Sequence, residues 1–392
     1  MKILLLGAGL QGRTALWDLA KSPCVSQLIV ADLDVKRLKS YVDSMGLMGI
    51  VDCRHVDIND PHTIHQLFVN KPDVVLDLLP VQYVNHITQL ALEYCCHLVN
   101  TCYTTAEMRN LGHQALESSI SFLPECGMDP GLDMILLQKA LIDFDTITRI
   151  RSYGAGIPHP DAIDNPLKYK ITWTLSGVLR AYCREGVILE HGDLRIIPGN
   201  SLFKEVNTHL VNINGLGVLE AFVSGNAAPY LELLGDSGKD LDHLGRYTLR
   251  WPGHCAFWEK LIALGFLDSE PVQLGKLAVD RQQYLSALLE PQLLLAELDQ
   301  DMAIVRIEVD GARNGVKGKG IYQITDTRDL QTGFTAMSRL VGFTASIAAQ
   351  LLGSGKLEHS GLLSPLVHLP YSIMEEELKQ RNIDITIQFY PE

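Results

Sequence analysis

The residues with the clearest chemical meaning lie near the start of the chain. Gly7, Gly9 and Gly12 have the spacing Gly-X-Gly-X-X-Gly, with Leu10 and Gln11 before the last glycine. In a strand–turn–helix unit, these glycines permit a tight turn, close approach of a pyrophosphate to the backbone, and close helix–strand packing. The N-terminus of the helix then presents its N–H groups and positive dipole end to the phosphates. The spacing therefore predicts a dinucleotide-binding loop.

The next apolar run carries a second signal for a dinucleotide. Residues 28–31 end at Asp32, about twenty residues beyond the last glycine. An acid at this place hydrogen-bonds the ribose hydroxyls of NAD and repels the 2′-phosphate of NADP. The cofactor is therefore predicted to be NAD in preference to NADP, although Lys36 and Arg37 follow closely.

The first part of the chain alternates apolar runs with helical segments, and this arrangement can position the loop and Asp32. Strands that alternate with helices predict a doubly wound parallel sheet, the Rossmann arrangement of an α/β protein. Ligands of such sheets bind beyond the carboxyl ends of the strands. The predicted strands are residues 2–6, 28–31, 50–56, 73–78, 97–101 and 121–124.

Further candidates follow the ends of these strands. Leu79 and Pro80 come after the fourth strand and are expected to border the cofactor. Asp57, after the third strand, either faces the adenine or is an acid in solvent. Tyr103, after the fifth strand, either hydrogen-bonds cofactor or substrate near the nicotinamide or closes the site without a chemical role.

The segment ECGMDPGLD, residues 125–133, follows the sixth strand. Asp129 followed by Pro130 is typical of a helix start, with an acid as N-cap and proline at the first helical position. One interpretation is structural only. In the other, Glu125 and Asp129 belong to the active site, where they bind a cation or manage protons. The helix dipole favours the ionised form of Asp129, which suits binding of a cation.

Composition limits the class of protein. The chain has 392 residues, of which 47% are hydrophobic, and this length predicts two domains. A formal net charge of −13 disfavours nucleic acid and anionic membranes as partners. The eight cysteines form no CxxC pair and no zinc spacing, so no metal site is predicted. Because we find neither a signal peptide nor a membrane-spanning apolar stretch, we expect a soluble cytoplasmic protein.

The second half of the chain has the pattern of an α+β domain with a mostly antiparallel sheet. Its candidate side chains are Arg250 for a substrate carboxylate, Trp173 for lining the substrate site, and His254 for accepting a proton. Each has a structural alternative, namely a surface charge, a core aromatic and a helix-end histidine. The strand-like runs are residues 146–153, 168–173, 209–213, 218–223, 302–309 and 320–325, the last two joined by a hairpin turn at residues 313–315.

Several motifs together resemble the saccharopine dehydrogenase family. They are GAGLQGR at 7–13, NTCY at 100–103, ECGMDPGLD at 125–133, SYGAGIPHP at 152–160, YTLRWPGH at 247–254 and TAMSRLVGFTASIAAQLLGSGKL at 335–357. The resemblance covers most of the chain and is closest to the lysine 6-dehydrogenase branch. It implies a homodimer that uses a nicotinamide cofactor on a carbon–nitrogen bond of a small amino-acid substrate.

The resemblance also implies that a late segment rejoins the first domain. We therefore predict an NAD-binding Rossmann domain of residues 1–128 plus 334–392, and a substrate and dimerisation domain of residues 129–333.

One departure from the family bears on the substrate. Saccharopine reductases carry Pro-Asn-Arg-Asp-Ser after a segment similar to residues 220–222, whereas residues 223–229 here are VSGNAAP, without arginine. Because arginine is the preferred bidentate partner of a carboxylate, a site for the extra carboxylates of saccharopine is in doubt. The resemblance then implies NAD-dependent oxidative deamination of L-lysine. The alternatives are a saccharopine or carboxynorspermidine dehydrogenase, a non-catalytic NAD-binding regulator, and a different Rossmann oxidoreductase that uses NADP.

Overall fold

The computed structural model describes residues 1–392, which divide into two compact units. Unit 1 comprises Met1–Gln138 and Ser338–Ile383, and unit 2 comprises Lys139–Met337 and Asp384–Glu392. Each unit has its own sheet and its own hydrophobic core. None of the helices has the length and apolar character that a membrane span requires.

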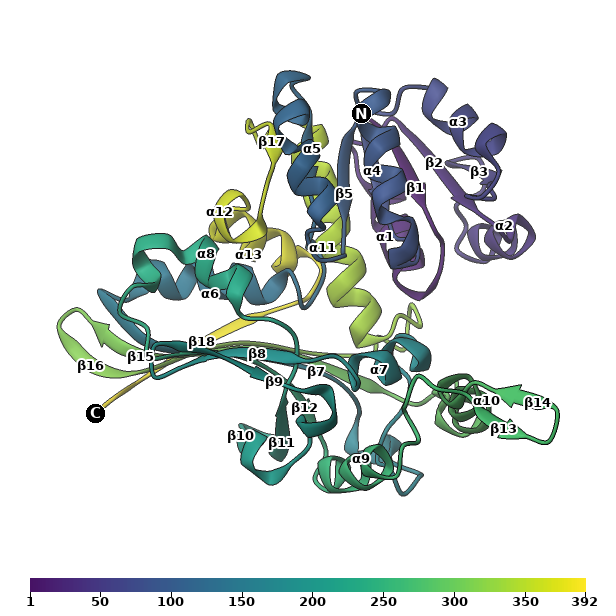
Figure 1. The fold of residues 1–392 in the computed structure, drawn as a ribbon. Helices are drawn as coiled ribbons and strands as arrows, with labels where there is room; N and C mark the ends of the chain where they lie inside the picture. Colours follow the sequence, from purple (N-terminus) through teal and green to yellow (C-terminus); the bar gives the residue numbers. More distant parts are fainter. The chain divides into compact units, whose positions relative to one another are not determined.

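A seven-stranded parallel sheet forms the centre of unit 1 (Figure 1). The order β3-β2-β1-β4-β5-β6 is that of a Rossmann fold and confirms the predicted doubly wound sheet. The direction of the winding changes between β1 and β4, where such sheets bind their ligands. A seventh strand, β17, pairs with β6 and was not predicted. The strands are β1 (Lys2–Leu6), β2 (Gln27–Asp32), β3 (Val51–His55), β4 (Val74–Asp77), β5 (His97–Asn100), β6 (Ser121–Leu123) and β17 (Gly361–Leu362).

The helices of unit 1 come from both of its chain segments. Glycine at position 342 in α11 allows close packing on α1, because a Cβ atom there would lie 2.7 Å from the carbonyl oxygen of Gln11. The helices are α1 (Leu10–Lys21), α2 (Val35–Ser44), α3 (Pro61–Val69), α4 (Val84–Glu93), α5 (Ala106–Glu117), α6 (Leu132–Asp143, which continues into unit 2), α11 (Ala336–Gly353, which begins in unit 2), α12 (Pro365–His368) and α13 (Tyr371–Gln380), with the 3-10 turn η1 (Val81–Tyr83).

A buried polar network ties the late segment of unit 1, residues 338–383, to α1. Asp18 of α1 accepts two hydrogen bonds of 2.8 Å from the guanidinium of Arg381, which follows α13. The same carboxylate accepts a bond of 2.6 Å from the hydroxyl of Ser346 in α11. Because a buried charge is tolerated only when it is paired and hydrogen-bonded, this network holds α11 and α13 in one arrangement on α1.

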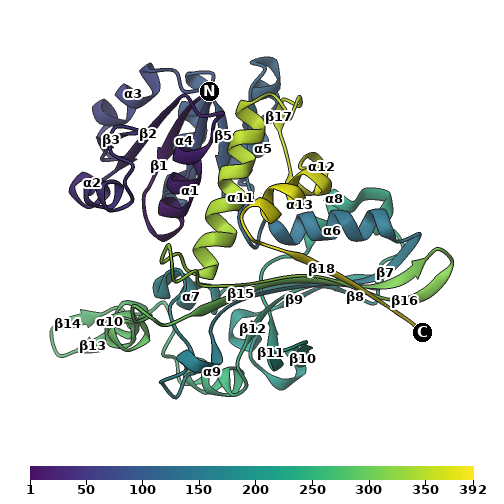
Figure 2. The same cartoon turned by 180° about the vertical axis from the view of Figure 1, so that it is seen from behind.

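Unit 2 is built on a nine-stranded mixed sheet with the main order β10-β11-β12-β7-β15-β16-β18, and β8 and β9 extend from β12 (Figures 1 and 2). The β7–β12 pair is parallel, and the other pairs are antiparallel, so the predicted α+β class is confirmed. The strands are β7 (Thr146–Pro158), β8 (Gly186–Glu190), β9 (Asp193–Ile197), β10 (Thr208–Ile213), β11 (Gly217–Val223), β12 (His243–Arg250), β15 (Asp301–Arg313), β16 (Val316–Thr327) and β18 (Ile385–Pro391), with a separate hairpin of β13 (Val272–Leu274) and β14 (Leu277–Val279).

The longest hairpin of unit 2 has the predicted turn. Asn314 (φ 50°) and Gly315 (φ 76°) join β15 to β16, because asparagine and glycine tolerate the left-handed backbone that a tight hairpin needs. The helices of unit 2 are α7 (Leu175–Ala181), α8 (Ala228–Leu234), α9 (His254–Ala263) and α10 (Arg281–Leu293), and the 3-10 turns are η2 (Pro160–Ala162), η3 (Gly199–Ser201), η4 (Glu205–Asn207) and η5 (Gly235–Gly238).

Two features of unit 2 differ from the sequence analysis. Residues 168–173 form no strand, because Ile171 donates its N–H to the carbonyl of Leu293 instead of joining a ladder. Residues 384–392 belong to unit 2, whereas the sequence-based division places all of 334–392 in the first domain. The reason is that β18 pairs with β16 along seven residues.

Candidate functional site

The glycine loop has the geometry that phosphate binding requires. Gly7 has a φ of +90°, and a Cβ at Gly12 would lie 2.1 Å from the carbonyl oxygen of Gly7, so both positions need glycine. A Cβ at Gly9 would meet nothing within 4 Å, which leaves this side of the loop open. Gly9 is also the N-cap of α1, and no side chain caps the helix. The first N–H groups of α1, from Leu10 and Gln11 onward, therefore remain available to an anion.

Asp32, the last residue of β2, is joined to this loop. Its carboxylate accepts a hydrogen bond of 2.7 Å from the N–H of Ala8 and another of 2.9 Å from the N–H of Asp34. The acid is thus held beside the loop at the end of the strand, as expected for a group that binds the adenosine ribose.

Two arginines near Asp32 were not singled out together in the sequence. The guanidinium of Arg13 lies over the ring of Tyr41, 4.8 Å from its centroid. Burial and the charge of Arg37 lower the pKa of Arg13, while Tyr41 and Asp32 act in the opposite direction. The end of β2 therefore combines one carboxylate with two guanidinium groups. The sequence signal that could have indicated this cluster is Arg13, which directly follows the last glycine of the loop.

The candidates after β3 and β4 differ in their surroundings. Asp57 accepts hydrogen bonds from the N–H and the side-chain amide of Asn59, so it stabilises the turn before α3. A Cβ at Gly7 would lie 2.9 Å from the carbonyl oxygen of Leu78 and 3.4 Å from the nitrogen of Leu79. The loop after β4, which includes Leu79 and Pro80, therefore lies against the glycine loop.

The exits of β5 and β6 bring two further candidates close together in unit 1. Glu125, which is buried with a φ of 65°, accepts a hydrogen bond of 3.0 Å from the N–H of Thr104, next to the exposed Tyr103. Asp129 is not an N-cap, contrary to the prediction. Gly131 has a φ of +141°, so the turn continues through it and α6 begins at Leu132.

In unit 2, Arg250 is a buried cation without a carboxylate partner. It is 6% exposed, its Nη1 donates to the carbonyl of Leu249 at 2.9 Å, and its Nε has no partner. Tyr182 and Tyr169 raise its pKa against the effect of burial. Glu220 lies opposite Arg250 in the β11–β12 register, but its carboxylate accepts the N–H groups of two residues at the start of α9, Gly253 and Cys255.

Two tyrosines and His254 surround Arg250. The guanidinium lies over the ring of Tyr169, 5.2 Å from its centroid, and the buried hydroxyl of Tyr169 has no partner. The hydroxyl of Tyr182 and Nε2 of His254 are 2.8 Å apart. Burial and the charge of Arg250 hold the pKa of His254 well below its usual range, so this histidine is neutral. His254 therefore lies in a buried aromatic cluster, and its predicted catalytic role stays a prediction.

Trp173 lies just before α7 with 37% of its surface exposed. A Cβ at Gly177 would come within 2.4 Å of its ring, so the indole covers the first turn of that helix. Its role in lining a substrate site stays a prediction as well.

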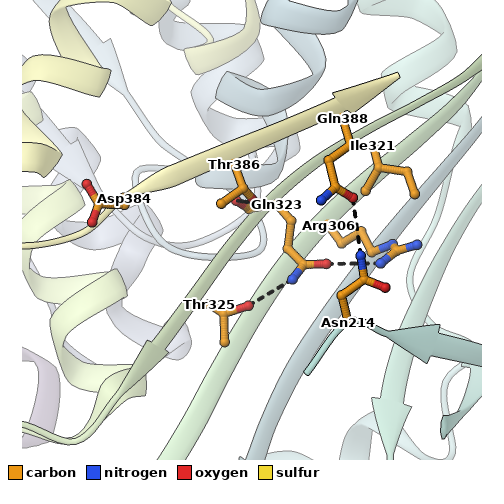
Figure 3. Close-up of a pocket in the computed structure, with 8 residues that line it drawn as sticks. All are labelled: Asn214, Arg306, Ile321, Gln323, Thr325, Asp384, Thr386 and Gln388. Atoms are coloured by element: carbon orange, nitrogen blue, oxygen red, sulfur yellow. Dashed lines mark hydrogen bonds between the residues drawn. The ribbon is translucent and has the colours of Figure 1, made fainter. Parts of the chain in front are cut away.

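A hollow of about 310 Å³ lies over β15, β16 and β18 (Figure 3). The cation in its lining, Arg306, is paired with Glu308 at 2.6 Å and donates to Gln323 at 3.0 Å. None of the predicted site residues lines this hollow. Because its cation is already neutralised, we assign no role to it in catalysis.

Comparison with known proteins agrees with these features. The saccharopine dehydrogenase NADP-binding domain matches residues 3–122, and the saccharopine dehydrogenase C-terminal domain matches residues 127–383. An α-aminoadipic semialdehyde synthase from Arabidopsis thaliana is 27% identical over 91% of this chain, which spans only 34% of that relative. The mitochondrial relatives of that name from rat and cattle are likewise spanned to about half their length.

Relatives of similar length to this chain also exist. A saccharopine dehydrogenase [NADP(+), L-glutamate-forming] from Pyricularia oryzae is 22% identical, with 97% of this chain and 96% of the relative covered. The apo saccharopine dehydrogenase (L-Glu forming) from Saccharomyces cerevisiae has the same fold, with a TM-score of 0.86, 19% identity and full coverage of both chains. A homospermidine synthase from Legionella pneumophila in complex with NAD has a TM-score of 0.66, with 12% identity and coverage of 99% and 91%. Since both halves of the family match in order, the chain belongs to the saccharopine dehydrogenase family, and unit 1 carries its NAD(P)-binding domain.

Proposed function

We propose that the chain is a nicotinamide-dependent oxidoreductase that removes hydride from the carbon beside an amino-acid amine, with L-lysine as the first substrate to test. The family supports chemistry on an amino acid. The observation that carries the substrate class is Arg250, a buried guanidinium without a carboxylate partner. A buried charge is costly when it is unpaired, and a substrate carboxylate would supply the missing partner.

The proposed cofactor is NAD. Asp32 supports this choice, because its carboxylate would accept the 2′-hydroxyl of NAD and repel a 2′-phosphate. Arg13 and Arg37 support the alternative, NADP, which also appears in the names of the fungal relatives. The open face at Gly9 and the uncapped start of α1 suit the pyrophosphate of either dinucleotide.

In the proposed reaction the protein binds and orients the substrate and accepts a proton from it. A bound nicotinamide supplies a hydride acceptor. For the α-carboxylate the proposed group is Arg250 of unit 2. For the proton of the ε-ammonium the candidates are the acids Glu125 and Asp129 of unit 1. Loss of that proton and of a hydride converts the carbon–nitrogen single bond to an iminium. Water then adds to the carbon, and ammonia leaves to give the aldehyde.

A saccharopine-type substrate is the second candidate. Residues 223–229 lack the arginine found in saccharopine reductases, but Arg246 of β12 lies over the ring of Tyr230, 4.4 Å from its centroid. A guanidinium near this segment supports a substrate with additional carboxylates. L-lysine, saccharopine and carboxynorspermidine therefore need to be compared directly.

The test follows reduced nicotinamide by its absorbance, with each of the three amines and with NAD or NADP. Turnover of L-lysine with release of ammonia supports the lysine proposal. Turnover of saccharopine but not of L-lysine contradicts the lysine proposal, while the broader proposal of a nicotinamide-dependent oxidoreductase that acts on an amino acid still holds. Binding of NADH without turnover of any amine supports the non-catalytic regulator instead.

We also propose that the chain is a homodimer, as the resemblance to the family implies. Light scattering coupled to size-exclusion chromatography measures the mass directly. A mass that stays at 43.4 kDa over the working concentration range contradicts this proposal.

A further inference from the structure

One buried acid in unit 1 has no place in the reaction described above. Asp77 is the last residue of β4 and is 4% exposed. One of its carboxylate oxygens accepts a hydrogen bond of 3.0 Å from the N–H of Leu79. It forms no ion pair. Burial raises its pKa from 3.8 to about 7, and no neighbouring charge contributes to this shift.

Asn100 lies beside this acid. It is the last residue of β5 and is opposite Asp77 in the parallel register, so the two side chains leave the same face of the sheet. Its Oδ1 accepts the N–H of Cys102 at 3.0 Å, whereas its buried Nδ2 has no hydrogen-bond partner. A completely buried amide donor without an acceptor is unusual in a folded protein and indicates a missing partner.

The sheet topology indicates which part of a dinucleotide this pair would meet. The glycine loop follows β1, and Asp32 ends β2, so the pyrophosphate and adenosine belong to the β1–β2–β3 half of the sheet. A dinucleotide extends across the switch point between β1 and β4. Its nicotinamide half then lies over the carboxyl ends of β4 and β5, where Asp77 and Asn100 are found.

We infer that Asp77 and Asn100 form a redox-sensing pair for the nicotinamide end, in which the Asp77 carboxylate favours the cationic oxidised ring and Asn100 donates to an acceptor on the nicotinamide half. The inference rests on dinucleotide binding by unit 1, which is part of the proposed function. Its physical basis is that the oxidised ring carries a positive charge and the reduced ring does not. An ionised carboxylate in a buried site therefore discriminates between them.

The other titratable groups near Asp77 lie on the strands, helices and turns next to β4 and β5. Burial, followed by the effect of Asp77, raises the pKa of Cys102 to about 12, so this thiol stays neutral. The carboxylate of Glu125 after β6 is bound to the N–H of Thr104. The neighbouring β1 ends without a titratable side chain. Further titratable side chains on adjoining elements are Lys2 of β1, His97 of β5, and His86 and Glu93 of α4, with Tyr83 and Tyr103 in the neighbouring turns.

The test measures binding rather than turnover. Dissociation constants of NAD⁺, NADH and ADP-ribose are determined by calorimetry between pH 5.5 and 8.5 for the unaltered chain and for Asp77→Asn. In the unaltered chain we expect NAD⁺ affinity to rise roughly tenfold across this range, because Asp77 ionises near the middle of it. Affinities for NADH and ADP-ribose should change little. In Asp77→Asn the rise with NAD⁺ should disappear.

A second variant separates the two residues. Asn100→Ser keeps an oxygen that can accept the N–H of Cys102 but removes the amide donor. We expect this variant to bind NAD⁺ and NADH more weakly by similar factors, while its affinity for NAD⁺ still rises with pH. ADP-ribose, which lacks the nicotinamide, should bind both variants as it binds the unaltered chain, and this result also shows that the variants fold.

The outcomes distinguish this inference from the proposed function. A pH-independent ratio of NAD⁺ to NADH affinity in the unaltered chain overturns the inference, whether or not Asp77→Asn folds. So does an Asp77→Asn variant whose ratio follows the same pH profile as the unaltered chain. Failure of the unaltered chain to bind any of the three ligands instead overturns the proposed dinucleotide function.

Discussion

At the scale of single residues, the partners of a charged side chain decide its chemical use. Asp18 and Arg381 pair with each other and hold helices together. Arg250 is equally buried, yet its opposite neighbour Glu220 binds the backbone at the start of α9. A cation left in this state is suited to an anionic ligand, because binding removes the cost of the unpaired charge.

Replacing Arg250 with glutamine tests this use. We expect Arg250→Gln to raise the KM for the amino-acid substrate about a hundredfold, since a charge-assisted pair with the carboxylate is lost. NADH affinity should not change. The variant should fold, because glutamine removes a buried charge. The matched control is Arg184→Gln, an exposed arginine of the same unit. A KM equal to that of the control would contradict the proposed carboxylate site.

Replacing Asp32 with asparagine tests the cofactor. Asparagine can still accept the N–H of Ala8, so the loop keeps its shape while the negative charge is removed. We expect the affinity for NADPH relative to NADH to rise roughly tenfold, because repulsion of the 2′-phosphate is relieved. Fluorescence titration measures both constants. Asp34→Asn, at the nearby N-cap of α2, is the control and should leave the ratio unchanged. An unchanged ratio in Asp32→Asn would remove the argument for NAD.

At the scale of elements, the glycines between β1 and α1 differ in what they do for the fold. Gly12 is needed by the fold, because a Cβ there would meet the backbone of Gly7. Gly9 has an ordinary φ of −68°, and a Cβ there would meet nothing in the protein. Nothing in the protein therefore requires glycine at position 9, whereas the proposed approach of a pyrophosphate would.

Two alanine substitutions make this difference measurable. We expect Gly9→Ala to change the free energy of unfolding by less than about 1 kcal/mol but to weaken NADH binding strongly. Gly12→Ala should lower the free energy of unfolding by about 2–3 kcal/mol through overpacking. Urea unfolding and NADH titration give the two quantities. Normal NADH affinity in Gly9→Ala would mean that no pyrophosphate approaches the loop there.

At the scale of the whole molecule, the two units divide the proposed function. Unit 1 has the features of a dinucleotide site, and unit 2 has the cation for a substrate carboxylate. The chain leaves unit 1, forms unit 2, and returns through α11 and α13, and β18 then completes the sheet of unit 2.

Hydrogen exchange tests this division without mutation. We expect saturating NADH to slow amide exchange at residues 7–13 and around the exits of β4 and β5, because a ligand stabilises the state that binds it. The amino-acid substrate should protect the segments that contain Tyr169, Tyr182 and Arg250. Mass spectrometry of peptides from both units locates the protection. Protection by NADH confined to unit 2 would contradict the assignment.

The sequence by itself determined the glycine loop, the acid at position 32, the doubly wound sheet and the hairpin at Asn314 and Gly315. These features depend on local rules, namely which residues tolerate a left-handed backbone and how apolar residues repeat along strands and helices. Only the tertiary structure decided where each charge finds its partner. It paired β18 with β16, placed the neutral His254 beside Tyr182, and brought Asp77 next to Asn100, all of which are contacts between residues distant in sequence. It also left Arg250 without a carboxylate partner. Such contacts depend on burial and strand register, which become defined only when the chain has folded.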